Sequence, residues 1–488
     1  MIELRNRHTR PAVLLLLAAI PRLFGAFFLP NAFGDAYVYI QEIGTLSTKI
    51  SNGSFRLTDL FGFWLPFYQL MAALLNVAVK NGFYSGKIVA ALFGAGTCLF
   101  VYLITQRLTG NHTAALWMFL VIALNPLHIF YSASAMTDVP HACLVLGALY
   151  FILSGNCIVA AIFGALAGFT RVESWMLVAL IPLLQFIRER RISIVAFLIL
   201  IIPPVLWFYI SWKATGNWLA CFVQRQQYHD WLLQMNPAIA RFSLINILKD
   251  GATLLISTDI AVLVASFAAA WVVIKRAPRL LKTGANRPDA HNLLPPVLVF
   301  FAFLALLLVA YVTHQQPIIF PRYGLVLFTL GLPMLAWIFL HIRKRYPESW
   351  RKVLLAIIAV LVCDISIQFA GAVGTVNQYR AQRVVADYLR EHFDPNSGGR
   401  IFCDEGTVRV LSGIPEEHFI TSSLAQRDDS RLELVAYLVV ADVQGSRFEK
   451  LMRRGEAPSF DGFEVVVHSY TSFLPTEIWL MKPSRTKK

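Results

Sequence analysis

Long apolar runs follow one another along most of the chain, separated by short polar stretches. The longest approach or reach the roughly 20 residues that an α-helix needs to cross a bilayer. The first run continues to Phe28 and ends in Leu29-Pro30 without a small-residue cleavage site, so we expect a retained helix rather than a signal peptide. The pattern predicts eleven spanning helices, at 11–29, 86–106, 113–130, 139–153, 157–170, 174–187, 193–212, 256–274, 293–313, 323–341 and 353–372.

Basic residues give these helices an orientation. They cluster before the first helix and in three later connections: Arg5, Arg7, Arg10, 188–191, 275–287 and 343–352. The positive-inside rule places such segments in the cytoplasm, and eleven helices satisfy all of them together. The odd number of helices then puts the C-terminal end outside the cytoplasm. A twelfth span at 64–79 would move Arg107 and every later basic segment to the wrong side, so we expect a short helix there, packed at the outer face.

Composition supports a membrane protein and excludes a nucleic-acid-binding one. Of the 488 residues, 57% are hydrophobic and 15% are charged, whereas a soluble domain carries about 25% charge. From Ala372 to Lys488 the chain holds 15 Lys and Arg against 16 Asp and Glu, which leaves 28 basic and 13 acidic residues in the membrane part. A basic excess confined to membrane connections is a topology signal and not a nucleic-acid footprint.

The last part of the chain predicts a small α/β domain. Its apolar patterns indicate helices at 384–393 and 447–454 and strands at 400–403, 434–441, 463–470 and 477–481. We therefore expect a polytopic α-helical membrane domain over residues 1–373 and an extracytoplasmic α/β domain over 374–488. On the outer side we expect a first loop at 30–85 and a long loop at 213–255.

Two acids stand at the outer ends of predicted helices. Asp35 follows the first helix in Phe33-Gly34-Asp35-Ala36-Tyr37, and Asp138 lies in Thr137-Asp138-Val139-Pro140 between two apolar helices. Either acid suits an ordinary helix start, and for Asp35 this is the stronger interpretation on sequence alone. A carboxylate is nevertheless an expensive cap beside hydrocarbon, and ionisable residues at membrane depth are candidates for function.

Further charged residues fall on the same predicted face. Arg171 and Glu173 interrupt an apolar run, either as a local ion pair at a helix turn or as an anion clamp. Arg322, followed by Tyr323 and preceded by His314, opens a helix on the outer side. It is either a phosphate site at a helix N-terminus or an arginine that snorkels to the interface.

All of these polar residues lie on the predicted outer face of the membrane domain. That face was assigned from the basic segments alone, so the polar residues did not influence the assignment. Two carboxylates and one or two arginines in a membrane-embedded cleft suit transfer from a phosphorylated lipid. A carboxylate can take the proton of an acceptor hydroxyl, while a guanidinium stabilises the departing phosphate.

The order of these motifs resembles that of the GT-C glycosyltransferases, in particular bacterial relatives of protein O-mannosyltransferases and lipid A aminoarabinose transferases. The resemblance covers roughly residues 11–190 and more thinly 311–335. It rests on Gly34-Asp35-Ala36-Tyr37, Trp64-Leu65-Pro66-Phe67-Tyr68, Leu108-Thr109-Gly110, Asn125-Pro126, Ala135-Met136-Thr137-Asp138-Val139-Pro140, Phe169-Thr170-Arg171-Val172-Glu173 and Pro321-Arg322-Tyr323.

The resemblance implies a donor sugar linked to polyprenyl phosphate, transferred at the extracytoplasmic face and usually with inversion. Asp35 matches the first-loop acid taken as catalytic base, and Asp138 matches the second-loop acid that helps form the site. Arg171 and Arg322 would then contact the lipid phosphate.

The chain departs from its relatives at two positions. Many relatives have Asp-Glu where this chain has Asp35-Ala36, and Glu42 on the same helical face is a candidate stand-in for the second acid. Many also place Lys before the proline of Trp64-Leu65-Pro66, so Lys87 or Arg171 would have to meet the phosphate. No His/Cys/Asp cluster has metal spacing, and the branch that uses monophosphate lipids generally needs no ion, although a divalent cation stays open.

Two other classes of function remain as alternatives. A lipid or solute transporter usually shows inverted repeats and paired broken helices near the midplane, and no repeat is visible here. A non-catalytic receptor or assembly protein would use the outer α/β domain as its binding module. The sequence names neither the sugar nor the acceptor, which can be a protein, a lipid or a glycan. It predicts a multi-pass protein of the inner (cell) membrane.

Overall fold

The computed structural model divides the chain into two compact units. The first is helical and holds residues 1–31 and 43–370, and the second holds residues 32–42 and 371–488. The sequence analysis assigned residues 32–42 to the membrane domain, whereas the structure groups them with the C-terminal part. The described residues are 2–235, 243–283, 288–313, 315–316, 318–375, 378–421, 435–441, 462–471 and 476–484.

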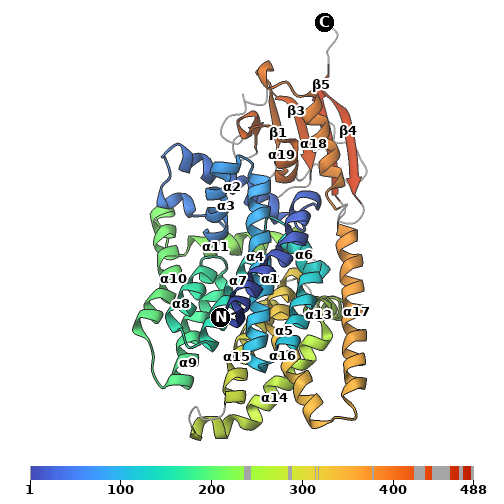
Figure 1. Cartoon of the computed structure of the whole chain (residues 1–488). Coiled ribbons are helices and arrows are strands. Elements are labelled where there is room, and N and C mark those ends of the chain that lie inside the picture. Colours follow the sequence, from blue (N-terminus) through green and yellow to red (C-terminus); the bar gives the residue numbers. More distant parts are fainter. Residues whose placement is uncertain are drawn as a thin grey trace. The chain divides into compact units, whose positions relative to one another are not determined.

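Helices occupy all eleven segments predicted to span (Figure 1). Those that begin in the first unit are α1 (Ile2–Phe28), η1 (Leu57–Leu60), α3 (Phe67–Val79), α4 (Gly82–Thr109), α5 (His112–Leu124), α6 (Pro126–Ser132), α7 (Asp138–Leu153), α8 (Cys157–Gly168), η2 (Val172–Met176), α9 (Leu177–Glu189), α10 (Ile194–Thr215), α11 (Ala220–Met235), α13 (Leu244–Thr258), α14 (Ile260–Thr283), α15 (Pro288–Val312), α16 (Pro321–Arg345) and α17 (Trp350–Thr375). Helix α2 (Asp35–Ser51) begins in the second unit and ends in the first.

The number of spans is smaller than predicted. Among the described helices, six are long and apolar enough to cross a membrane, or up to eight if each bent pair counts as one span. Three of the predicted spans, α7, α8 and α9, fall short of that length, with 16, 12 and 13 residues. The short helix expected at 64–79 is the 13-residue α3. The long outer loop expected at 213–255 contains α11 and most of α13.

Two pairs of helices each meet at a sharp bend, and the first pair occupies the predicted span 113–130. Helices α5 and α6 meet at 62°, where Pro126 begins α6 and the Asn125 side chain accepts a hydrogen bond from the His128 amide at 2.8 Å. Helices α13 and α14 meet at 84° around Asp259, whose backbone adopts a φ of 69°. The Asp259 carboxylate accepts a hydrogen bond from the Ala261 amide at 2.8 Å and so caps the new helix.

A buried arginine satisfies backbone groups freed by the first break. The last carbonyls of a helix have no partner within it. Arg22 of α1, which is fully buried, donates to the carbonyls of Ile122 at 3.1 Å and Ala123 at 3.4 Å, and its guanidinium lies 2.9 Å from His128 Nδ1. The guanidinium therefore holds α1 against the point where α5 ends.

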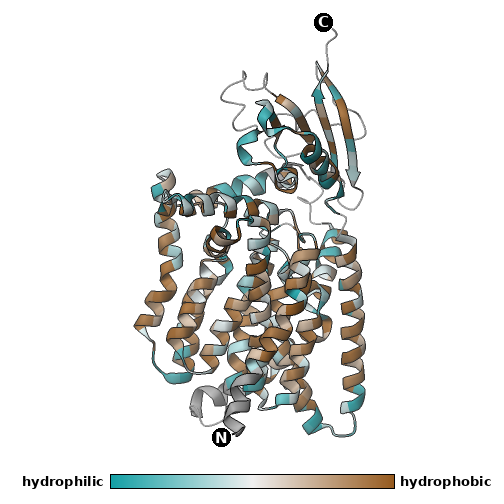
Figure 2. Ribbon diagram, turned by 45° about the horizontal axis from the view of Figure 1, so that its top comes forward, coloured by the Kyte–Doolittle hydropathy of each residue, from teal (hydrophilic) through white to brown (hydrophobic). Residues whose placement is uncertain are grey.

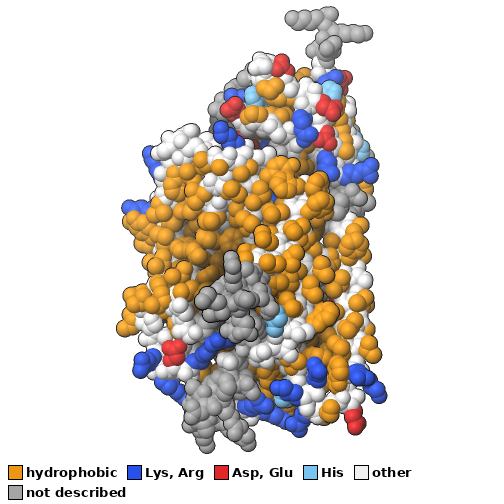
Figure 3. Space-filling view, viewed as in Figure 1, with side chains coloured by type: hydrophobic (Ala, Val, Ile, Leu, Met, Phe, Trp, Pro, Cys, Tyr) orange, Lys and Arg blue, Asp and Glu red, His pale blue; other side chains and the backbone are white. Residues whose placement is uncertain are grey.

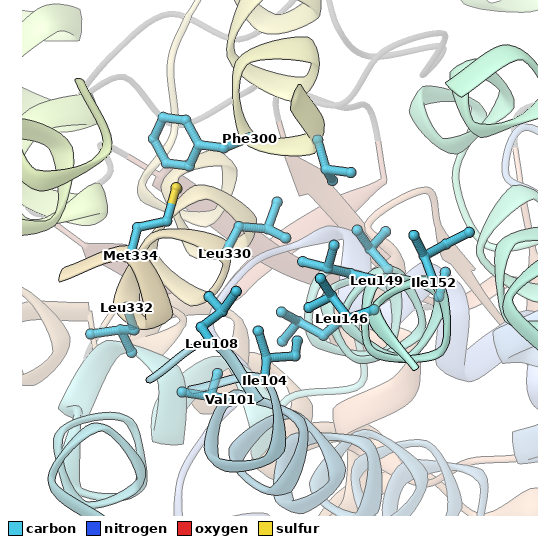
Figure 4. Packing of buried hydrophobic residues seen from close by; sticks show 14 of the residues in the cluster. Val101, Ile104, Leu108, Leu146, Leu149, Ile152, Phe300, Leu330, Leu332 and Met334 are labelled. Atoms are coloured by element: carbon cyan, nitrogen blue, oxygen red, sulfur yellow. The ribbon is translucent and has the colours of Figure 1, made fainter. Parts of the chain in front are cut away.

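The core of the first unit lies where α4, α7, α15 and α16 pack against one another (Figure 4). Buried side chains fill this contact, among them Val101, Ile104, Leu108, Leu146, Leu149, Ile152, Phe300, Leu330, Leu332 and Met334. Close approach depends on small residues, as is usual between membrane helices. A Cβ atom on Gly147 of α7 would lie 2.2 Å from the ring of Phe163 in α8.

Hydrophobic residues make up most of the length of the helices in the helical unit (Figure 2). In the face of Figure 3, many of its Lys and Arg side chains gather at the end where α9 finishes and α16 turns into α17. Two of the predicted basic segments, 188–191 and 343–352, lie at these positions. Both segments lie at the same end of the helical unit, as expected if they face the same side of the membrane.

The second unit contains a five-stranded sheet in the order β2-β1-β3-β5-β4. Strand β1 pairs in parallel with β2 and β3, and β5 pairs antiparallel with β3 and β4. Helix α18 packs its apolar residues, including Val385 and Leu389, against the core of the sheet. The elements are α18 (Arg380–His392), η3 (Pro395–Ser397), β1 (Arg400–Cys403), α19 (Gly406–Ser412), η4 (Glu416–His418), β2 (Phe419–Ile420), β3 (Val435–Ala441), β4 (Phe463–Thr471) and β5 (Thr476–Pro483).

The predicted α/β character of this unit is confirmed. The four predicted strands correspond to β1, β3, β4 and β5, and the helix at 384–393 corresponds to α18. Helix α19 and the short strand β2 were not predicted. The helix expected at 447–454 lies outside the described residues.

Candidate functional site

An arginine in the turn between α8 and α9 is the centre of the most connected charged cluster. Arg171 has an extended backbone, with φ of −147° and ψ of 141°, and the turn η2 follows it directly. Its Nη2 atom lies 2.8 Å from Glu173 Oε1, and Nε lies 3.3 Å from both oxygens of the same carboxylate. The local ion pair that the sequence left as one of two interpretations is therefore present.

The same guanidinium also binds an acid far away in the sequence. Arg171 Nη1 lies 2.8 Å from Asp138 Oδ1, although the two residues are 33 positions apart. Asp138 begins α7, and its side chain is 5% exposed. Thr137 is the N-cap of this helix and its side chain makes no capping hydrogen bond, while the Asp138 side chain pairs with the arginine.

The second carboxylate oxygen of Asp138 accepts no hydrogen bond from Arg171. Within the described part of the chain, no donor reaches the buried Oδ2 atom. A buried acceptor without a partner costs about 1–3 kcal/mol. Such an atom is uncommon in a folded protein, and it marks Asp138 as a group that can accept a hydrogen bond from a ligand hydroxyl.

A second contact fixes the turn against α7. His141 lies one helical turn after Asp138, and its Nε2 atom is 2.7 Å from the hydroxyl of Ser174 in η2. Both side chains are buried. The sequence analysis did not find this pair. A histidine three residues after an acid on an apolar helix was the available signal, and its partner could not be known before α7 and η2 were placed.

The start of α16 completes the cluster. The Arg171 guanidinium carbon lies 5.9 Å from the centre of the Tyr323 ring, and that of Arg322 lies 5.3 Å from the same ring. Arg322 also lies 5.4 Å from the ring of Phe320. Both distances to Tyr323 are within the range of cation–π attraction. The structure thus brings together Asp138, Arg171, Glu173, Arg322 and Tyr323, which we call the arginine cluster.

The arginine cluster lies toward the end of the helical unit opposite the basic connections. Helix α9 follows η2 and has 13 residues, about 20 Å of helix, with Arg188 in its last turn. Helix α16 likewise starts at Pro321 and ends in Arg343, Lys344 and Arg345. Both helices therefore run from the cluster to the basic end.

Electrostatics favour the charged forms of Arg171 and Glu173. Burial disfavours the charge of Glu173, but the Arg171 guanidinium more than offsets this and lowers the pKa of Glu173 to about 2. Burial likewise opposes the charge of Arg171, and the carboxylates of Glu173 and Asp138 reverse its effect, so the pKa of Arg171 rises above its usual value.

The other predicted residues lie elsewhere. Lys87 of α4 is fully buried, donates to the Leu29 carbonyl at 2.5 Å and lies 4.7 Å from the Phe83 ring, so the contacts seen in the described part of the chain do not join it to the arginine cluster. His314 lies outside the described residues. Asp35 begins α2 and belongs to the second unit, together with Glu42. Among the described residues, no three His, Cys, Asp or Glu side chains form a possible metal site.

Comparisons with known proteins give a fold. No protein-family model matches the chain, and no curated protein matches it. A crystal structure of ArnT from Cupriavidus metallidurans bound to undecaprenyl phosphate is similar with a TM-score of 0.58 and 13% identity, over 96% of this chain and 97% of that one. ArnT from the same organism in the apo state gives a TM-score of 0.48 and 11% identity, over 97% and 98%. Over nearly its whole length, this chain therefore has a fold similar to that of ArnT.

Proposed function

We propose that this protein is a membrane glycosyltransferase that moves a sugar from a polyprenyl-phosphate donor to an acceptor. The observation that carries the proposal is the nearly full-length similarity to an ArnT structure bound to undecaprenyl phosphate. The arginine cluster supports it independently, because it gathers acids and arginines at one end of the helical unit. The acceptor is a protein, a lipid or a glycan.

The reaction needs a base for the acceptor hydroxyl. In our proposal Asp35 takes the proton as the hydroxyl oxygen forms a bond to the anomeric carbon. The bond from that carbon to the phosphate oxygen breaks, and polyprenyl phosphate leaves with the electron pair. Asp35 suits this role by its place at the start of α2, in the segment that matches the first loop of GT-C enzymes.

The departing phosphate needs a positive partner, and we assign this role first to Arg322. Arg322 lies in the first turn of α16, where the helix N-terminus adds partial positive charge. Arg171 already holds two carboxylates, so we assign it mainly to keeping Asp138 in place, with a secondary contact to the phosphate. The unmatched oxygen of Asp138 would accept a hydrogen bond from the sugar.

The positive-inside rule supplies the orientation of the proposal. The basic segments around 188–191 and 343–352 would face the cytoplasm, which places the arginine cluster and the C-terminal unit on the extracytoplasmic side. Accessibility of single cysteines introduced at Ser484 and Ser349 to an impermeant thiol reagent in intact cells tests this orientation.

The first test of the function is donor-lipid binding. Undecaprenyl phosphate is titrated against the full-length protein in nanodiscs, for wild type, Arg322→Ala and Arg343→Ala. Both arginines belong to α16, at opposite ends, so the second variant is a matched control. A hydrogen bond to a charged group contributes about 1.5–3 kcal/mol, so Kd should rise roughly 10- to 100-fold in Arg322→Ala. Equal affinities in all three proteins would contradict the phosphate role.

The second test is transfer itself. Purified protein is incubated with undecaprenyl-phosphate sugars and membrane extracts, and release of undecaprenyl phosphate is measured. Release that depends on acceptor supports a transferase. Tight lipid binding with no release from any donor, together with flipping of the lipid in vesicles, would favour a transporter instead.

A further inference from the structure

The segment that carries Asp35 is part of the C-terminal unit. Residues 32–42 follow α1 in the chain, but they form one compact unit with residues 371–488. The segment holds the first turns of α2, from Asp35 to Glu42. It contacts Gln378 and Tyr379, which lie just before α18, and Arg409 of α19, and these contacts account for the grouping.

The first contact holds the backbone just before Asp35. The side-chain amide of Gln378 donates to the Ala32 carbonyl at 2.9 Å, across 346 positions of sequence. Both residues are 3% exposed, so the hydrogen bond is protected from water. It immobilises the chain three residues ahead of the acid.

The second contact holds the helix just after Asp35. The rings of Tyr37 and Tyr379 meet edge to face, with their centres 5.1 Å apart. Tyr37 is 1% exposed and Tyr379 is 7% exposed. A Cβ atom on Gly34 would lie 3.4 Å from the Tyr379 hydroxyl, so Tyr379 lies beside the chain on both sides of Asp35.

A third contact lies further along α2. Arg409 of α19 donates to the Gln41 side chain at 3.5 Å, and its guanidinium also pairs with Glu416 at 2.5 Å. Arg409 belongs to the body of the domain, because α19 follows β1 directly in the chain. The segment is thus attached at Ala32, Tyr37 and Gln41.

We infer that Gln378 and Tyr379 are positioning residues for Asp35, so that the C-terminal domain carries the proposed catalytic acid. The residues after them form α18, whose Ala381, Val385 and Leu389 are fully buried in the core of the domain. A connected path therefore runs from the sheet through α18 to the chain around Asp35.

This inference rests on the proposed function only for the role of Asp35. A general base must lie within about 2.6–3.2 Å of the atom whose proton it takes, and a displacement of about 1 Å can cost 100-fold in rate. Because the C-terminal domain contacts the residues on either side of Asp35, it affects turnover without contacting the substrate.

Hydrogen exchange on the full-length protein tests the attachment. The variants are Gln378→Ala, Tyr379→Ala and the conservative Tyr379→Phe, which keeps the ring. The matched control is Tyr388→Ala, because Tyr388 also belongs to this domain but its ring meets Tyr437 at 6.3 Å. We expect amides 33–42 to exchange about fivefold faster in the two disrupting variants, the effect of one lost net hydrogen bond in Gln378→Ala and of one lost aromatic pair in Tyr379→Ala. Tyr379→Phe and Tyr388→Ala should match wild type there.

Turnover supplies the second readout. Gln378→Ala and Tyr379→Ala should lower kcat about 10-fold or more with an unchanged KM for the lipid donor, and Tyr379→Phe should recover it. Unchanged exchange of residues 33–42, or faster exchange with normal kcat, would overturn the inference. If wild type transfers no sugar, the proposed function fails, and the exchange data still decide whether the C-terminal domain holds this segment.

Discussion

Removing Arg171 should destabilise the helical unit through one particular neighbour. Arg171 pairs with Asp138 and Glu173, whose side chains are 5% and 33% exposed. Loss of one partner from a buried ion pair costs about 3–5 kcal/mol, because a charge remains in a poorly solvated place. An exposed pair contributes only about 0–1 kcal/mol.

The two carboxylates therefore contribute unequally to the loss. Glu173 can regain water in the variant, whereas Asp138 cannot, so we assign most of the cost to Asp138. Arg171 itself is 19% exposed, which places the effect at the low end of the range. We expect Arg171→Ala to lower the free energy of unfolding by about 3 kcal/mol near pH 8.

The assay is denaturant titration of the purified protein in mixed micelles, with a second substitution to identify the responsible acid. Adding Asp138→Asn to Arg171→Ala should recover about 2 kcal/mol, because a neutral amide replaces the stranded charge. Adding Glu173→Gln should recover less than about 1 kcal/mol. Equal recovery by the two second substitutions, or wild-type stability in Arg171→Ala, would refute the assignment.

Three further predictions follow from individual contacts. Asp35→Asn should abolish sugar transfer while membrane insertion and lipid binding stay normal, and residual turnover near wild type would remove Asp35 as base. Arg171 lowers the pKa of Glu173 to about 2, so this ion pair stabilises the fold above a pH of about 4.5 and loses its effect as the pH falls toward 2. In Glu173→Gln, the free energy of unfolding should therefore fall less steeply on the acid side of its pH profile. Gly324→Ala should destabilise by about 1–3 kcal/mol in thermal unfolding, since the new Cβ would lie 2.8 Å from the backbone carbon of Ser257 in α13. If Gly324→Ala left thermal unfolding unchanged, α13 and α16 could move apart without loss of stability, and the prediction would be wrong.

The chemistry of the site could be predicted only in pieces. The sequence identified Asp138, Arg171, Glu173, Arg322 and Tyr323 as candidates because charged groups are rare in apolar runs. It left the Arg171–Glu173 ion pair as one of two interpretations, and the structure contains it. It did not find His141 and Ser174, and it assigned Lys87 a role for which its contacts give no support.

The sequence by itself determined which segments are helical, which end of the helices is basic and where most strands of the C-terminal domain lie. These features depend on the length and period of apolar runs, which are local properties of the chain. The break at Asn125, inside the predicted span 113–130, was missed because a continuous apolar pattern does not reveal a sharp bend.

Only the tertiary structure decided which distant residues meet. The pairing of Asp138 with Arg171, the approach of Tyr323 to the same guanidinium and the hold of Gln378 on Ala32 join positions that no periodicity connects. Such contacts follow from how whole helices and a domain pack, because a side chain's partner is set by the path of the backbone around it. For the same reason the sequence placed Asp35 with the membrane domain, while its neighbours in space belong to the C-terminal one.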